Sequence, residues 1–269
     1  MPITISIHYN PVDSDCEGLI IARPQNILII GAGSAIARAL SRRYAGRGCR
    51  LVLTGRDPEA LQRQARDLTL RGAALADTIL LDVNDSDQAL QAVIDDARGR
   101  LGSIDAAVLC HGTLPDQTSI AHDPARVQDA IATNGLSTIR LLCHLVPVLR
   151  LQGNGTLAVI TSVAGDRGRG SNYIYGSAKA LVSTYLQGLR AELHPDGIHV
   201  MDIRPGFVDT PMTSQFRKGP LWSTPDRVAR QIEQGIRRRR DILYTPGFWR
   251  LIMWVIRLIP EPVFKRSGL

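Results

Sequence analysis

Short apolar runs alternate with amphipathic stretches along most of the chain. Apolar, β-branched runs that are typical of buried strands occupy residues 26–30, 50–54, 78–81, 105–109, 156–161 and 198–203. Helical periodicity occupies residues 35–45, 61–71, 85–101 and 125–149, and further helices begin at about residues 173 and 225. Strands that alternate with helices of about 10–15 residues predict right-handed βαβ units in a doubly wound parallel sheet. No repeat or linker interrupts the alternation, so the sequence predicts a single α/β domain over residues 25–246.

Two segments flank this domain. Residues 1–24 begin with isoleucines that alternate with other residues, as on an edge strand, and continue as a polar loop to which the sequence assigns no role. Residues 247–269 contain an apolar stretch shorter than the ~20 residues needed to cross a bilayer. Arg250, Trp254 and Arg257 share one face of the helix expected there, and the remaining surface is almost entirely apolar. The chain is thus predicted to end in a basic, amphipathic tail.

The charge distribution indicates a partner for this tail. The chain of 269 residues is 44% hydrophobic and 21% charged, as in a globular protein, with a net charge of +7. Residues 237–240 are four consecutive arginines, and Lys265 and Arg266 follow near the C-terminus. This clustering favours an anionic membrane surface as partner and does not call for nucleic acid. The alternative is that the tail packs on the domain or on a second subunit.

Cysteine usage and the N-terminus indicate the compartment. The first residues carry acidic side chains and no basic stretch before an apolar core, unlike a secretory signal. The four cysteines, Cys16, Cys49, Cys110 and Cys143, are too widely separated for a metal-ligand pattern. We therefore expect reduced, packed thiols, no metal site and a cytoplasmic protein, peripheral on the inner face of the membrane if the tail binds there.

Three residues form the clearest candidate for catalysis. Ser162 follows the strand at residues 156–161, and Tyr175 and Lys179 lie one turn apart on the next helix. A phenol has a pKa of about 10, and a neighbouring ammonium lowers it by favouring the phenolate. A hydroxyl from the strand end could hold a carbonyl oxygen against the same phenol. Taken alone, the Tyr/Lys spacing also occurs on ordinary surface helices.

The turn after the first strand is a candidate dinucleotide site. In a doubly wound sheet the pyrophosphate lies on the first helix N-terminus, beyond the carboxyl ends of the strands. Gly31 and Gly33 permit close approach of the backbone, and Ser34 can donate a hydrogen bond to a phosphate. Ala35 and Ile36 open the helix behind them and complete the expected contacts. The alternative is a tight strand–helix turn with no ligand.

The end of the second strand bears on the choice of cofactor. A NAD enzyme holds a carboxylate there against the ribose 2′-hydroxyl, whereas this chain has Gly55 and Arg56. A guanidinium suits a 2′-phosphate, so NADP(H) is favoured, and the neighbouring Asp57 leaves NAD(H) open. Asp82 and Val83, after the third strand, are expected to contact the adenine, with a plain helix cap as the alternative.

Together these motifs make the chain resemble a short-chain dehydrogenase/reductase, which has a Rossmann fold, over about residues 26–244. Ser162, Tyr175 and Lys179 match the family's Ser…Tyr-x-x-x-Lys, and Asn134 matches the asparagine that completes its catalytic tetrad. Residues 204–210 match the Pro-Gly…Thr loop near the nicotinamide. Two stretches depart from the pattern: alanines replace glycines at positions 35 and 37, and residues 109–112 replace Asn-Asn-Ala-Gly.

The resemblance implies a role for each matched residue. Tyr175 would donate a proton to the carbonyl oxygen while hydride is transferred, Ser162 would orient that oxygen, and Lys179 would lower the Tyr175 pKa and bind the nicotinamide ribose. Asn134 would hold a water that links Lys179 to solvent. Further contacts expected around the nicotinamide are His111, Gly112, Pro205, Gly206, Val208 and Thr210. Because histidine titrates near neutrality, a catalytic role of His111 is the alternative.

Other segments suggest the substrate. Residues 110–116, the stretch 163–167 and the basic tail resemble the narrower group of decaprenylphosphoryl-2-ketoribose reductases, which act on a lipid-linked keto-sugar. Residues 210–223 lack strong periodicity and are expected to form a substrate lid. The runners-up are a soluble alcohol or steroid dehydrogenase and a non-catalytic nucleotide-binding regulator. The helices of Asn134 and Tyr175 are expected to pair in a homo-oligomer, as is usual in the family.

Overall fold

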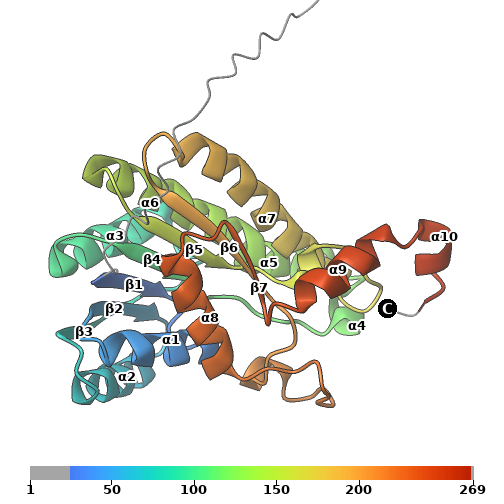
Figure 1. Ribbon diagram of the computed structural model, residues 1–269, viewed down its shortest axis with the longest axis horizontal. Helices are drawn as coiled ribbons and strands as arrows, with labels where there is room; N and C mark the ends of the chain where they lie inside the picture. Colours follow the sequence, from blue (N-terminus) through green and yellow to red (C-terminus); the bar gives the residue numbers. More distant parts are fainter. Residues whose placement is uncertain (1–24, 268–269) are drawn as a thin grey trace, which may run out of the picture.

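The computed structural model describes residues 25–267, and these residues form a parallel sheet covered by helices on both faces (Figure 1). The strands are β1 (Asn26–Ile30), β2 (Arg50–Gly55), β3 (Leu75–Leu80), β4 (Ala106–Leu109), β5 (Thr156–Ile160), β6 (His199–Pro205) and β7 (Ile242–Thr245). The longer helices are α1 (Ala35–Ala45), α2 (Pro58–Leu70), α3 (Asp87–Leu101), α5 (Pro124–Ile131), α6 (Ser137–Gln152), α7 (Tyr173–Leu193), α8 (Pro225–Arg237) and α9 (Trp249–Leu258). The predicted doubly wound α/β domain is confirmed.

The strand order places a crevice in the middle of the sheet. The order is β3-β2-β1-β4-β5-β6-β7, and all the pairings are parallel. The direction of winding reverses between β1 and β4, where Ile30 at the end of β1 pairs with Leu109. Ligands of such sheets bind beyond the carboxyl ends of the strands at this reversal. The topology therefore selects the edge of the sheet at which a site is expected.

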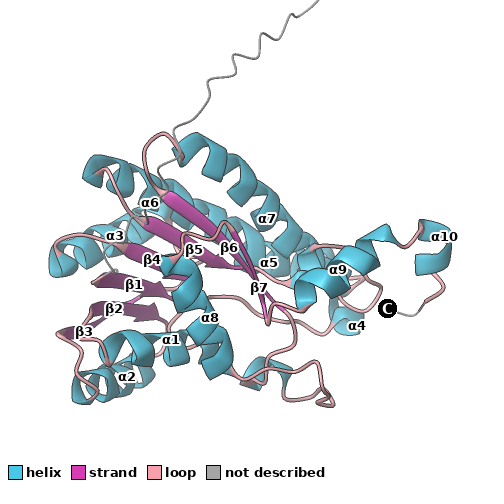
Figure 2. Cartoon of the chain, in the orientation of Figure 1, coloured by secondary structure: helices cyan, strands magenta, loops and turns pink. Residues whose placement is uncertain are grey.

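Helices cover both faces of the sheet (Figure 2), and each face has its own apolar core. Because successive side chains of a strand point to opposite faces, Ile27 and Ile29 of β1 pack with α1, α2 and α8, whereas Leu28 and Ile30 pack with α3, α6 and α7. All four of these side chains are fully buried. This two-sided burial explains why the strands are continuous apolar runs in the sequence.

Three details of the secondary structure differ from the prediction. β3 covers Leu75–Leu80 instead of residues 78–81, because all its residues pair with β2 although this edge strand is only partly buried. β7 is an additional edge strand, and it was not predicted because it is short and only partly buried. The helix expected at residues 125–149 contains a π-helical turn, Ala132–Leu136, between α5 and α6.

The C-terminal tail forms α9 and the short helix α10 (Glu261–Phe264), which project beyond β7 (Figure 1). Trp249 and Met253 are buried against the domain. Arg167 donates hydrogen bonds to the carbonyl oxygens of Ile256 and Ile259 and stacks over the Phe264 ring at 3.7 Å. The expected amphipathic helix therefore exists, and one of its faces packs on the domain.

The opposite face of α9 remains apolar and exposed. Leu251, Trp254 and Leu258 are 65%, 61% and 62% exposed. No helix within residues 25–267 combines the length and the apolarity needed to span a membrane. The N-terminal extension predicted at residues 1–24 lies outside the described residues.

Cys110 and Cys143 form no disulfide within the described part of the chain. Cys49 and Cys110 are buried, as expected for packed thiols, and burial raises the pKa of both. Cys143 on α6 is exposed, so the prediction of a packed thiol is wrong there because this position lies on the solvent side of the helix. Cys16 lies outside residues 25–267, and within that range no cluster of acidic, His or Cys side chains has the arrangement of a metal site.

Candidate active site

A cavity of about 500 Å³ lies at the carboxyl ends of the strands, where the topology places a ligand site. Ser162 and every predicted cofactor contact line it: Gly31, Gly33, Ser34, Ala35, Ile36, Arg56, Asp82, Val83, His111, Gly112, Tyr175, Lys179, Pro205, Gly206, Val208 and Thr210. Asn134 is fully buried behind the wall of the cavity. The fold thus brings together residues that are up to 179 positions apart in the sequence.

Ser162 and Tyr175 meet across one end of the cavity. Ser162 follows β5, and Tyr175 lies in the first turn of α7. The Ser162 hydroxyl also accepts a hydrogen bond from the Ala164 amide at 3.1 Å, which fixes its position at the start of a 3₁₀ turn. Burial raises the pKa of Tyr175 to about 12, and a hydrogen bond with Ser162 only partly opposes this. Tyr175 is therefore a neutral phenol at pH 7, which can donate a proton.

The pKa of Tyr175 is raised and not lowered, although Lys179 lies one turn further along α7. The Lys179 Nζ lies over the Tyr175 ring, 5.7 Å from the centroid, and donates a hydrogen bond to the Ile160 carbonyl oxygen at 3.3 Å. The expected lowering of the Tyr175 pKa is thus overcome by burial. Burial also lowers the pKa of Lys179 itself to about 8, although the charge of Asp202 opposes this shift. Burial therefore favours the neutral form of both side chains.

Asn134 supports the site from within the π-helical turn. Its Oδ1 accepts a hydrogen bond from the Thr113 amide at 2.8 Å, and its Nδ2 donates to the Ala130 carbonyl oxygen at 3.0 Å. Gly112, at φ +153°, packs so closely that a Cβ there would lie 2.9 Å from Asn134 Oδ1 and 3.4 Å from Lys179 Nζ. Asn134 therefore fixes the loop after β4 beside Lys179. One lone pair of its Oδ1 remains for the predicted water.

The β1–α1 turn has the geometry of a phosphate cradle. Gly31 adopts φ +80°, and a Cβ there would lie 2.6 Å from the His111 backbone nitrogen, so only glycine fits. The first amides of a helix have no acceptor within the helix, and the Ser34 side chain makes no capping hydrogen bond to those of α1. Ser34 and Ala35 line the cavity at this helix N-terminus. These groups fit the pyrophosphate of a dinucleotide.

Asp57 after β2 and Asp82 after β3 have different surroundings. Asp57 caps α2 by accepting a hydrogen bond from the Ala60 amide at 2.9 Å. Arg56 is 73% exposed at the side chain and lies 3.7 Å from Asp82. Asp82 does not cap a helix, because Ser86 has that position in α3. Arg56 and Asp82 are therefore the charged side chains of these strand ends that face the cavity.

His111 has a structural environment that excludes the catalytic alternative. Its Nε2 lies 2.9 Å from the Ser137 hydroxyl and 3.1 Å from that of Thr138. Burial, and to a smaller extent the Lys179 charge, lowers the pKa of His111 to about 3. The expectation that His111 titrates near neutrality is wrong, because the sequence does not show that the ring is enclosed. The uncharged His111 side chain therefore forms part of the cavity wall.

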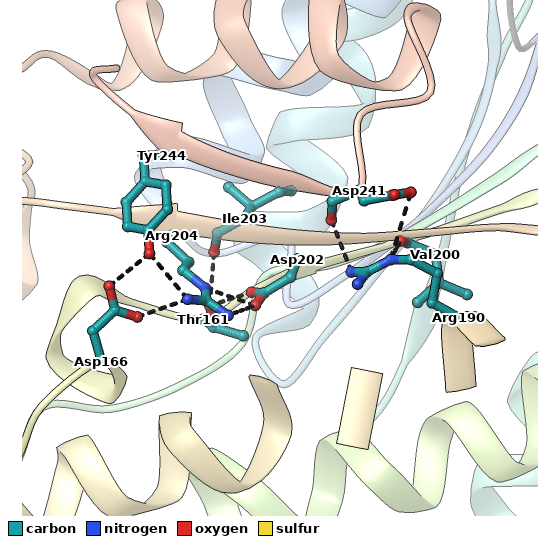
Figure 3. A network of polar contacts seen from close by, with 9 residues as sticks. All are labelled: Thr161, Asp166, Arg190, Val200, Asp202, Ile203, Arg204, Asp241 and Tyr244. Carbon is teal, nitrogen blue, oxygen red and sulfur yellow. Dashed lines mark hydrogen bonds and ion pairs between the residues drawn. The ribbon is translucent and has the colours of Figure 1, made fainter. Parts of the chain in front are cut away.

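A buried ionic network, which was not predicted from the sequence, includes Thr161, the residue before Ser162 (Figure 3). Arg204 on β6 donates to Asp202 and to Asp166, each at 2.8 Å, and the Tyr244 hydroxyl of β7 donates to Asp166 at 2.7 Å. Thr161, adjacent to Ser162, donates to Asp202. The network ties the loop that carries Ser162 to β6 and β7. The signal that could have revealed it is an Asp and an Arg two residues apart within an otherwise apolar strand.

The segment predicted as a lid forms one wall of the cavity. Val208 forms a bridge with Ser223, and the Asp209 amide donates to the Ser223 carbonyl oxygen at 2.9 Å, so the segment is a loop closed at its base. Thr210, Pro211, Met212 and Thr213 line the cavity. At the same wall, a Cβ on Gly206 would collide with the Trp249 indole of the tail. The lid and the tail thus meet at the side of the cavity formed by residues 205–213.

Comparisons with known proteins agree with this geometry. A family model described as short chain dehydrogenase matches residues 25–220. An uncharacterized oxidoreductase of Streptomyces coelicolor is 39% identical over 251 residues, which cover 90% of this chain and 96% of that protein. An uncharacterized oxidoreductase of Mycobacterium tuberculosis is 35% identical, with 89% and 96% covered. Sulfoacetaldehyde reductase 2 of Chromohalobacter salexigens is 34% identical, with 70% and 74% covered. The chain therefore belongs to the short-chain dehydrogenase family, and it is an NAD(P)-binding oxidoreductase.

Proposed function

We propose that the protein is an NADPH-dependent reductase that converts a ketone into a secondary alcohol. The observation that carries this proposal is the neutral phenol of Tyr175, which is hydrogen-bonded to Ser162 at one end of the cavity. Reduction of a ketone requires a proton donor at the carbonyl oxygen, and a phenol of raised pKa is protonated at neutral pH. The same cavity extends to a helix N-terminus that suits a pyrophosphate.

Each side chain of the catalytic set has its own role at the substrate carbonyl group. A bound nicotinamide supplies the hydride. Ser162 orients the carbonyl oxygen, and Tyr175 gives its proton to that oxygen as negative charge develops there. Lys179 stabilises the phenolate that remains and binds the nicotinamide ribose, while Asn134 holds the adjacent loop and the water through which Lys179 exchanges protons with solvent. Pro205 and Gly206 form the wall beside the nicotinamide.

The preference for NADPH rests on the residues after β2. Asp57, the carboxylate that could have bound a ribose 2′-hydroxyl, is engaged at the N-terminus of α2. Arg56 is exposed, and its contact with Asp82 is as long as 3.7 Å, so it can turn toward a 2′-phosphate. A charge-assisted hydrogen bond of this kind favours NADPH over NADH.

A lipid-linked keto-sugar is the proposed substrate. The resemblance of the active-site loops and the tail to decaprenylphosphoryl-2-ketoribose reductases supports it. The name of the Chromohalobacter relative specifies a carbonyl compound with an anionic group, which agrees with a phosphorylated ketone. The exposed apolar face of α9 would hold the enzyme where such a lipid is located. A soluble alcohol or steroid dehydrogenase is the second candidate, and it would have no use for this face.

We further propose that α9 lies on the cytoplasmic leaflet, with arginines beside its apolar face. Deleting the tail would also remove Trp249, which packs against Gly206 of the cavity wall, so substitution of Leu251, Trp254 and Leu258 by serine is the cleaner test. The triple variant should stay in the supernatant when it is sedimented with anionic vesicles, whereas the unmodified protein should pellet. If both stay in the supernatant and the substitutions dissociate a dimer, the face is a subunit interface. Pairing through α6 and α7 remains the proposed route to a homo-oligomer.

The direct test of the substrate is NADPH oxidation with a panel of keto-sugars, free and polyprenyl-linked. The proposal expects turnover with the linked sugars and much weaker turnover with the free ones. Equal turnover with simple ketones or keto-steroids would favour the second candidate. Absence of turnover with every carbonyl, together with tight NADPH binding, would indicate a nucleotide-binding regulator, which would have no need of the complete set Asn134, Ser162, Tyr175 and Lys179.

A further inference from the structure

The charged side chains that line the cavity include a guanidinium with no assigned role. Of the described residues that line it, the charged ones are Arg56, Asp82, Arg169 and Lys179. Arg56 and Asp82 face each other after β2 and β3, at the nucleotide end. Lys179 is held by the Ile160 carbonyl oxygen beside Tyr175. Arg169 remains, on the segment between Ser162 and Tyr175 that brings the two catalytic hydroxyls together.

The Arg169 guanidinium is incompletely paired although much of it is buried. Its Nε is inaccessible to solvent and has no hydrogen-bond partner among residues 25–267. The acid whose charge acts on it is Asp166, but both Asp166 oxygens are already engaged, one by Arg204 at 2.8 Å and the other by the Tyr244 hydroxyl at 2.7 Å. A buried guanidinium without a matched acceptor is unfavourable unless a ligand supplies one.

Asn172 provides an independent observation at the same place. It also lines the cavity, and its Oδ1 is buried without a hydrogen-bond partner in the described part of the chain. Its backbone amide donates to the Arg169 carbonyl oxygen at 3.1 Å, so a tight turn holds the two residues together. Although Asn172 precedes α7, its side chain does not cap that helix. The turn thus presents a charged donor and an acceptor to the cavity, three residues before Tyr175.

We propose that Arg169 and Asn172 form a substrate subsite that binds a phosphate group on a carbon adjacent to the reacting carbonyl, together with a neighbouring hydroxyl. Arg169 donates to the phosphate oxygens, and Asn172 accepts from the hydroxyl. This deepens the proposed function and rests on it, because a keto-sugar phosphorylated next to its ketone would carry both groups. The subsite would select phosphorylated hydroxyketones over uncharged ones.

The network of Figure 3 engages both oxygens of Asp166, the acid whose charge acts on Arg169. Arg204 lies between Asp166 and Asp202 and pairs with both carboxylates. The side chains of Asp166 and Asp202 are 2% and 0% exposed, so this pairing is shielded from salt and from solvent. Burial lowers the pKa of Arg169, but a guanidinium stays protonated in proteins. The positive charge at the substrate end is therefore permanent.

The test compares dihydroxyacetone phosphate with dihydroxyacetone, which share the ketone and differ in the phosphate. The unmodified enzyme should have the higher kcat/KM for the phosphorylated ketone. R169Q should lower that value about 10- to 150-fold, as expected for loss of a charged hydrogen bond, and leave dihydroxyacetone unchanged. R169K should restore part of the loss. R63Q, at an exposed arginine of α2 that does not line the cavity, is the matched control and should behave as the unmodified enzyme.

Four results would overturn the proposal. An equal loss on both ketones would show a structural role, and no loss on either would show that Arg169 does not touch the phosphate. Weaker NADPH binding by R169Q would assign Arg169 to a cofactor phosphate instead. If neither ketone is reduced, calorimetric titration of the enzyme–NADPH complex with dihydroxyacetone phosphate decides separately. If the unmodified protein binds the compound and R169Q does not, the subsite is supported although the proposed reduction fails. If the unmodified protein does not bind it, the subsite is refuted.

Discussion

The two ends of the cavity are built on different principles. At the end with Ser162 and Tyr175, the supporting charges of Asp202 and Arg204 are buried and engaged in several hydrogen bonds each. At the end with Arg56, the guanidinium is mostly exposed and has one contact with Asp82. The first arrangement holds atoms in place for chemistry, whereas the second leaves a side chain free to adapt to the cofactor.

This difference indicates how each end responds to substitution. A buried network couples its members, so loss of one charge leaves its partners uncompensated in a medium of low polarity. An exposed charge is solvated with or without its partner, so its loss affects only the ligand that it contacts. Changes at the rigid end should therefore affect stability and turnover, and changes at the adaptable end should affect cofactor affinity alone.

The largest effect is expected for Arg204→Met. The change leaves Asp166 and Asp202 buried without their shared cation, which should reduce the free energy of unfolding by about 3–5 kcal/mol. Arg150→Gln is the control, because Arg150 pairs with Glu192 and Asp196 on the surface and should lose less than about 1 kcal/mol. Urea unfolding measures both. Similar losses in the two variants would contradict the contrast between buried and exposed pairs.

Tyr175→Phe should lower turnover by a factor on the order of 10² or more, because the proton donor is lost while the ring remains. NADPH binding should be retained, since Lys179 keeps its hydrogen bond to the Ile160 carbonyl oxygen. Steady-state rates together with a fluorescence titration of NADPH check both expectations. Turnover close to that of the unmodified enzyme would mean that another group donates the proton.

Arg56→Ala tests the adaptable end. Loss of a charged hydrogen bond to the 2′-phosphate should weaken NADPH binding by about 1.5–3 kcal/mol and leave NADH binding and protein stability unchanged. Titrating the two cofactors by nicotinamide fluorescence provides the measurement. An equal loss for both cofactors would refute the assignment of Arg56 to the 2′-phosphate.

The smallest effect concerns His111 and pH. Its pKa is about 3 in the folded chain and about 6.5 when unfolded, so between these values the unfolded chain binds a proton that the folded chain does not. Stability therefore falls as the pH drops below about 6.5, and by pH 5 this residue contributes a loss of at most about 2 kcal/mol. His111→Gln should show a correspondingly smaller decrease in unfolding free energy between pH 7 and pH 5. An unchanged decrease would indicate that His111 is protonated within the fold.

Much of the fold follows from local patterns in the chain. Buried parallel strands are continuous apolar runs, and a tyrosine and a lysine four residues apart must share a helix face, so β1, β5 and the Tyr175–Lys179 pair are visible in the sequence. The edge strands β3 and β7 are only partly buried, so the same apolar signal is weak there. Prediction was thus reliable where burial is uniform.

The electrostatic properties of the site could not be predicted in the same way. The raised pKa of Tyr175 and the lowered pKa of His111 both follow from enclosure by distant segments. Likewise, Arg169 Nε has no hydrogen-bond partner among residues 25–267, where Arg204 and Tyr244 occupy both oxygens of Asp166. Such properties depend on which side chains meet in space, which periodicity and spacing do not reveal.

The most direct test of the account follows deuterium from the cofactor to the product. The enzyme would be incubated with dihydroxyacetone phosphate and NADPH that carries deuterium on the transferred face of C4 of the nicotinamide. Deuterium should appear on the new carbinol carbon of the product. Tyr175→Phe should bind the cofactor but form this product more slowly, by a factor on the order of 10². Product that forms without deuterium at that carbon, or at an equal rate in the variant, would contradict hydride transfer assisted by Tyr175.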